Sequence, residues 1–242
     1  MKYYGLILFW VCFSFSCNNE IEEIDNSDLG YDFFPIKIGA TRTYQSDSII
    51  YLGGGLRRDT VKSFILEEIG ESFKDASGNQ QYKVYRSIKR KITDSWQRIN
   101  TWTVSSDASS VIRNEENLKF IKLVFPIRKG LRWNGNAFLD TDIKIDVGGE
   151  SLQAYKNWKH RIEEVDVEIT FKNQKIKSAK VNLVSDSSII DIRKVTEFYG
   201  RGLGLIRKEM TILDSDGSKP SEAWVKKAQK GFIHTLTLID AN

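Results

Sequence analysis

Apolar and polar residues alternate along most of this chain, a pattern that puts successive side chains on opposite faces of an extended backbone. The alternating runs are rich in β-branched and aromatic residues, which favours strands over helices. Twelve such runs are predicted as strands: 43–52, 60–73, 81–92, 96–105, 110–114, 119–125, 141–147, 163–172, 176–185, 189–199, 203–214 and 231–240.

Turn-forming residues separate many of these runs. Gly53 to Gly55, Asp75 to Asn79 and Asp214 to Gly217 supply residue types that tolerate positive φ at the ends of hairpins. Connections this short favour antiparallel neighbours, because parallel pairs need long crossover segments.

Two segments are predicted as helices. In 151–162, Tyr155, Trp158 and Ile162 recur at helical spacing, and 221–230 begins after Pro220 and ends before Gly231. The sequence therefore predicts a mainly β fold: a large curved antiparallel sheet, open or half-closed as a barrel, with one or two short helices.

The first residues have the character of an export signal. Lys2 precedes an apolar run from Tyr3 to Phe15, which is shorter than the roughly 20 residues that span a membrane. Ser16 is a small residue directly before Cys17, as in lipoprotein signals. We therefore predict a signal peptide over 1–16, lipidation of Cys17, an acidic flexible tether over 17–30 and a single β-rich domain over 31–242.

Two other interpretations of the first residues stay open. The run could be an ordinary signal peptide cut after Ser16, or a buried core strand or helix. Lipidation would anchor the chain to a membrane, since two acyl chains hold far better than one. We expect an outer-membrane lipoprotein of the cell envelope, on the periplasmic face or the cell surface.

Charge and cysteine content narrow the class of function. Lys and Arg number 36 against 32 Asp and Glu, and the two signs are interspersed, so no nucleic-acid partner is expected. Of the two cysteines, Cys12 lies in the signal and Cys17 would carry lipid, which leaves no thiol for catalysis. We expect no cofactor.

Three segments depart from plain alternation. They are Tyr31 to Gly39 with its Phe33-Phe34-Pro35 centre, Phe125-Pro126 followed by Gly130 and Trp133-Asn134-Gly135-Asn136, and Tyr199-Gly200-Arg201-Gly202-Leu203-Gly204-Leu205. Together they resemble a family of uncharacterised Bacteroidota lipoproteins found at the outer membrane and cell surface. Arg42 stands where that family usually has tryptophan. The resemblance implies an anchored all-β domain and brings no activity with it.

Two glycine-containing motifs are better explained as turns. Gly200, Gly202 and Gly204 precede a predicted strand, whereas a dinucleotide fingerprint needs a following helix. Asp214 and Asp216 resemble the start of a calcium loop, but the glycine comes fourth and no glutamate follows in register. A hairpin turn is favoured, and a weak surface calcium site is left open.

The aromatic residues offer the best candidate contacts. Trp133, Asn134 and Asn136 put an indole beside two amides on a predicted turn, an arrangement able to contact a ligand. We hypothesise a non-enzymatic binding or assembly module whose partner is an envelope protein, a glycan or an apolar ligand. One alternative is a half-barrel carrier or sensor for an apolar ligand. The second is a hydrolase with a dispersed site, which would need His160 or His234 against a carboxylate and a hydroxyl.

Overall fold

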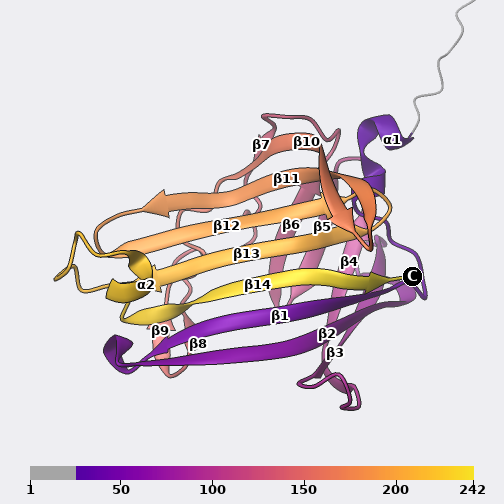
Figure 1. Ribbon diagram of the computed structural model, residues 1–242. Coiled ribbons are helices and arrows are strands. Elements are labelled where there is room, and N and C mark those ends of the chain that lie inside the picture. The colour runs from indigo at the N-terminus through magenta and orange to yellow at the C-terminus, as the bar shows by residue number, and fades with distance from the viewer. Residues whose placement is uncertain (1–25) are drawn as a thin grey trace, which may run out of the picture.

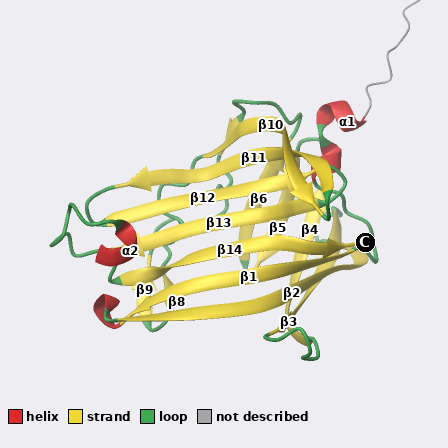
Figure 2. Cartoon of the chain, in the orientation of Figure 1, coloured by secondary structure: helices red, strands yellow, loops and turns green. Residues whose placement is uncertain are grey.

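A twelve-stranded antiparallel sheet dominates the computed structural model, which describes residues 26–242 (Figure 1). The strand order is β6-β5-β4-β3-β2-β1-β14-β13-β12-β11-β10-β7. Most neighbours follow one another in the chain, but β1 pairs with β14 and so joins the two ends of the domain. Figure 2 shows that helix is confined to short turns. The predicted mainly β fold is confirmed.

The strands of the large sheet are β1 (Thr41–Leu52), β2 (Arg57–Lys74), β3 (Gln80–Lys89), β4 (Gln97–Ser106), β5 (Ser110–Glu115), β6 (Leu118–Val124), β7 (Arg132–Trp133), β10 (His160–Phe171), β11 (Gln174–Ser187), β12 (Asp191–Gly200), β13 (Gly204–Asp214) and β14 (Lys230–Ala241). A separate hairpin comprises β8 (Ile145–Val147) and β9 (Glu150–Leu152). The helical turns are α1 (Asn26–Leu29), η1 (Tyr31–Phe33), η2 (Gly53–Gly55) and α2 (Trp224–Lys227). Each predicted strand overlaps an observed one.

The two outer strands of the sheet, β6 and β7, meet along a seam. The backbone N–H of Ile121 donates to the Gly135 carbonyl at 2.9 Å. In return the Trp133 indole N–H donates to the Ile121 carbonyl at 2.8 Å. Because strands twist with one hand, a long sheet curls until its edges approach, and here these bonds join them. The sheet is therefore half-closed as a barrel.

The inner face of the sheet forms the hydrophobic core. In β2, Ser63, Ile65, Glu67 and Ile69 are buried while the residues between them are half-exposed, as the period of two requires. The core also takes fully or nearly fully buried residues from the other strands, among them Tyr44, Val84, Val111, Leu123, Ile162, Val181, Val195, Tyr199 and Ile212.

One end of the barrel is closed by the residues that precede β1. Phe33 is fully buried, and the Leu29 carbonyl accepts the backbone N–H of Ile127 at 2.9 Å. Gly30 has φ of +81°, and a Cβ there would lie 2.6 Å from Ile127, so this packing requires glycine. Residues 26–30, which we assigned to the flexible tether, thus form a helical turn and a packed connection.

The helix predicted over 151–162 is wrong. The segment contains β9, a series of turns and the start of β10 at His160. Trp158 and His160 are both buried, two positions apart, which is a strand spacing. β10 pairs with β11 along nearly all of its length, and this pairing outweighs the helical spacing of Tyr155, Trp158 and Ile162. The helix predicted over 221–230 exists but is a single turn, α2, because β14 begins at Lys230.

Among the described residues, no helix is both long enough and apolar enough to cross a membrane.

Candidate functional site

A groove of about 1150 Å³ runs along the edge of the sheet where β7 pairs with β10, and it extends to residues of β11. Two of its residues, Trp133 and Asn134, are among the three that the sequence singled out as ligand contacts. The complete lining is Arg132, Trp133, Asn134, Thr141, Asn157, Trp158, Lys159, His160, Arg161, Glu163, Asn182, Val184, Ser185 and Asp186.

The backbone on either side of β7 holds Trp133 in place. Trp133 pairs with His160 across the β7–β10 ladder. Just before β7, the N–H of Ile162 donates to the Leu131 carbonyl at 2.9 Å, and the N–H of Gly130 donates to the Ile162 carbonyl at 2.8 Å. Together with the bond from Ile121 to Gly135 after β7, these bonds hold a strand of two residues at both ends, which gives the indole a defined position.

A row of aromatic rings lies beneath the groove and along the seam. Centroid separations are 5.5 Å for Phe120–Tyr155, 5.4 Å for Tyr155–Trp158, 5.8 Å for Trp158–His160 and 5.3 Å for Trp133–His160. These tilted or edge-on contacts are favourable for aromatic pairs. The Trp158 indole N–H donates to the Ala154 carbonyl at 2.9 Å. Both indole N–H groups are therefore engaged within the protein. Trp158 is 7 % exposed and belongs to the core, so the half-buried ring of Trp133 is the indole surface that a ligand can reach.

His160 is a packed, neutral histidine. Its Nδ1 accepts the backbone N–H of Gly135 at 3.3 Å, so the proton sits on Nε2. Burial, reinforced by the nearby Lys122 ammonium, lowers the pKa of His160 to about 4. No carboxylate or hydroxyl is hydrogen-bonded to it among residues 26–242. His160 lacks the partners that a general base in a hydrolase needs.

His234 is no better placed for hydrolysis. Its Nε2 lies 3.1 Å from the Ser46 hydroxyl. Asp47, whose charge acts on His234, follows Ser46 directly in β1 and so faces the other side of the sheet, where it accepts from Gln45 at 2.6 Å. Burial, with Lys208 and Arg86, lowers the pKa of His234 to about 4. Neither histidine meets the requirement set for the hydrolase alternative.

The interior of the barrel is filled by its own side chains. Glu67 is buried between the guanidinium groups of Arg113 at 2.6 Å and Arg86 at 3.0 Å. The space beside Glu67 and Tyr44 measures about 10 Å³, room for roughly one water molecule. This interior gives no support to the carrier or sensor of an apolar ligand, which would need a larger cavity lined by apolar side chains.

The rim of the groove is polar and almost balanced in charge. Arg132, Lys159 and Arg161 oppose Glu163 and Asp186. Glu163 pairs with Lys180 at 2.9 Å, and Asp186 accepts from the Asn157 amide at 2.7 Å. The remaining amides and hydroxyls of the rim come from Asn134, Thr141, Asn182 and Ser185. Such a rim suits a ligand with many hydroxyl groups and little net charge.

Asn136, the third residue singled out from the sequence, does not line the groove. It is 2 % exposed, and neither polar atom of its side chain has a hydrogen-bond partner in the described structure. Its backbone N–H donates to the Asn134 side-chain oxygen at 3.1 Å. Asn157, Asn182 and Asp186 were missed because they meet only in the folded sheet, where Asn182 pairs with Arg161 and Asn157 donates to Asp186. The sequence carries no local signal for these contacts.

The other sequence candidates have structural roles. Asp214 pairs with the Arg193 guanidinium at 2.7 Å, and Asp216 accepts from Ser218 at 2.6 Å and Gln229 at 2.6 Å. Within residues 26–242, no group of three or more His, Cys, Asp or Glu side chains is placed to hold a metal. Gly200 and Gly204 flank the turn from β12 to β13, as expected. Cys17 and the predicted signal lie outside the described residues.

Comparison with known proteins yields two solved structures. No protein-family model matches the chain, and no curated protein does. One structure is an exported-protein candidate from Bacteroides fragilis with a YmcC-like fold, 10% identical, with a TM-score of 0.39 over 87% of this chain and 98% of that one. The other is a lipoprotein candidate from Parabacteroides distasonis, 12% identical, with the same TM-score and coverage. The fold class of this chain therefore rests on its own sheet.

Proposed function

We propose that this protein is a lipoprotein of the cell envelope whose groove beside Trp133 binds a neutral, hydroxyl-rich glycan. The observation that carries the proposal is the lining of the groove, in which the half-buried indole ring of Trp133, held by its bond to Ile121, lies among amides, hydroxyls and nearly balanced charges. Aromatic rings stack on the apolar faces of sugars, while amides and hydroxyls donate to and accept from sugar hydroxyls.

The anchor follows from the sequence around Cys17. An apolar run, a small residue and then a cysteine followed by acidic residues are typical of bacterial lipoproteins, and the three segments described above resemble a Bacteroidota family of that kind. We place the protein at the outer membrane, with the groove available to glycans of the periplasm or the cell surface.

The anchor is tested by metabolic labelling with a clickable palmitate analogue. The native protein should take up label and Cys17→Ser should not. Label on neither protein would refute lipidation and leave an ordinary secreted chain. Label on both proteins would show that a residue other than Cys17 is acylated.

Glycan binding is tested with the full-length protein in mild detergent. The probe is an array of neutral linear oligosaccharides built from glucose, mannose, galactose or N-acetylglucosamine. Binding to at least one series is expected, with a loss of roughly tenfold or more in Trp133→Ala and a smaller loss in Asn134→Ala. Trp96→Ala is the matched control, because Trp96 is also half-buried but stacks on Lys89 away from the groove.

Two outcomes would refute the glycan proposal. One is the absence of binding to every series by a protein whose thermal unfolding is cooperative. The other is binding that Trp133→Ala and Trp96→Ala weaken equally, because such binding would not depend on the groove.

A further inference from the structure

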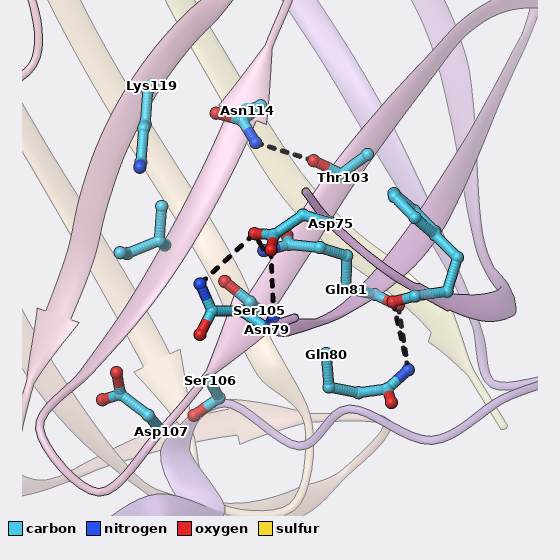
Figure 3. Close-up of a pocket in the computed structure, with 12 residues that line it drawn as sticks. Asp75, Asn79, Gln80, Gln81, Thr103, Ser105, Ser106, Asp107, Asn114 and Lys119 are labelled. Atoms are coloured by element: carbon cyan, nitrogen blue, oxygen red, sulfur yellow. Dashed lines mark hydrogen bonds between the residues drawn. The ribbon is translucent and has the colours of Figure 1, made fainter. Parts of the chain in front are cut away.

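A second polar depression lies beyond the loop that borders the groove. It measures about 410 Å³, sits on the outer face of β3, β4 and β5, and is flanked by the β2–β3 turn (Figure 3). We call it the β4 pocket. Its lining is dominated by amides and hydroxyls, with one aromatic ring: Phe73, Asp75, Asn79, Gln80, Gln81, Thr103, Ser105, Ser106, Asp107, Ile112, Asn114 and Lys119.

Some polar groups of the β4 pocket are engaged and others are not. Asp75 accepts the backbone N–H groups of Ser77 and Asn79, each at 2.9 Å, and so stabilises the turn. Asp107 caps its own turn through Oδ1. The hydroxyls of Ser105 and Ser106 have no hydrogen-bond partner among the described residues. These groups are able to bind a ligand.

An exposed aromatic ring lies between the β4 pocket and the groove. Phe138 is 53 % exposed, and the Lys119 ammonium at the margin of the pocket lies 4.1 Å from its ring centroid. Phe138 belongs to residues 134–141, whose Asn134 and Thr141 line the groove. The bond from Ile121 to Gly135 holds this segment against β6.

We propose that the groove, Phe138 and the β4 pocket form one binding track, so that the ligand is a linear glycan chain rather than a single sugar. A chain that leaves the groove past Asn134 meets the exposed face of Phe138, then Lys119, then the free hydroxyls of the β4 pocket. The track has sugar-stacking rings at Trp133 and Phe138 and hydrogen-bonding groups at each end. This inference rests on the proposed glycan binding and extends it to the length of the ligand.

The test is the dependence of affinity on chain length. Full-length protein is titrated with dimers, tetramers and octamers of the four neutral sugars named above. The octamer should bind more tightly than the dimer. Phe138→Ala and Ser105→Val should each weaken octamer binding by roughly five- to tenfold and leave dimer binding unchanged. Ser105→Val suits its strand position and fills the pocket without removing a bond of the fold.

Controls separate this proposal from the one on which it rests. Leu56→Ala removes another exposed apolar side chain, 94 % exposed at the β1–β2 turn, and should change neither affinity. Trp133→Ala should weaken dimer and octamer alike. Two outcomes would refute the track but not glycan binding in the groove. One is equal affinity for dimer and octamer, and the other is octamer binding that neither Phe138→Ala nor Ser105→Val weakens. Absence of all binding would overturn both.

Discussion

The Glu197 carboxylate in β12 accepts a hydrogen bond from the Lys122 ammonium in β6 at 2.7 Å, across the interior of the barrel. Both side chains are almost completely buried, and Lys208 lies 3.4 Å from the same carboxylate oxygen. Although burial by itself would raise it, the two ammonium groups hold the pKa of Glu197 well below its usual range. The pair links an outer strand of the sheet to the opposite wall.

Glu197→Gln should destabilise the protein strongly, because it leaves the Lys122 and Lys208 charges in the interior without their carboxylate. The expected loss in the free energy of unfolding is about 3–5 kcal/mol, measured by urea denaturation at neutral pH. Glu168→Gln is the control, since Glu168 pairs with Lys175 at 2.7 Å in solvent and should contribute little. Equal stability of the two variants would contradict the role given to the buried pair.

Acidification should destabilise the protein before the carboxylates titrate. The pKa of His160 and that of His234 are both lowered to about 4 by burial, against 6.5 when unfolded. Between these values the unfolded chain binds more protons, so the free energy of unfolding falls as the pH drops from about 6.5 to 4.

The loss in the free energy of unfolding over this pH range is on the order of 3 kcal/mol for His160 and smaller for the more exposed His234. Urea denaturation at pH 7, 6 and 5 measures the slope. The double variant His160→Gln, His234→Gln should have a flatter profile than the native protein whatever its absolute stability. If the free energies of unfolding of the native protein and the double variant change equally with pH, groups other than these histidines cause the pH dependence.

The contact between Gly135 and His160 should show strong energetic coupling. A Cβ at position 135 would overlap the imidazole ring, because the backbone of Gly135 packs directly on it. Gly135→Ala alone should cost about 1–3 kcal/mol through this clash. In the His160→Ala background the same change should cost much less. A double-mutant cycle followed by urea denaturation measures the coupling, and additive losses would refute the contact.

Arg193→Lys should weaken the attachment between the sheet and the segment after β9. The Arg193 guanidinium donates to the carbonyls of Gln153 at 2.9 Å and of Ile192 and Leu213 at 3.0 Å, and it pairs with Asp214. A lysine ammonium cannot reproduce this planar fork, so a loss of about 1–3 kcal/mol is expected.

Hydrogen exchange should locate the effect of Arg193→Lys, with faster exchange in residues 150–156 than in the native protein. Arg207→Lys is the control, because the Arg207 side chain is half exposed in β13. An unchanged exchange pattern would mean that the fork is not what holds this segment.

The candidate site could be predicted from the sequence only in part. Trp133 and Asn134 stand out because an indole beside an amide on a turn is a local pattern. Asn157, Asn182 and Asp186 carry no such pattern. The pairing of β10 with β11 places Asn182 opposite Arg161, and a hydrogen bond joins Asn157 to Asp186 on the same rim. Asn136 shares the local pattern of Asn134 but is buried, directly after Gly135, whose carbonyl accepts the backbone N–H of Ile121 in β6.

The sequence by itself determined the strands, since a period of two in side-chain polarity is a local property of an extended chain. It also determined the antiparallel pairing of neighbours, which short connections impose. It misassigned 151–162, where a coincidence of helical spacing competed with pairing partners far along the chain. Only the tertiary structure decided that β1 pairs with β14, that Ile121 and Gly135 close the seam, and that Lys122 meets Glu197 inside. These contacts join residues far apart in sequence, and their free energy depends on burial and geometry that no short segment contains.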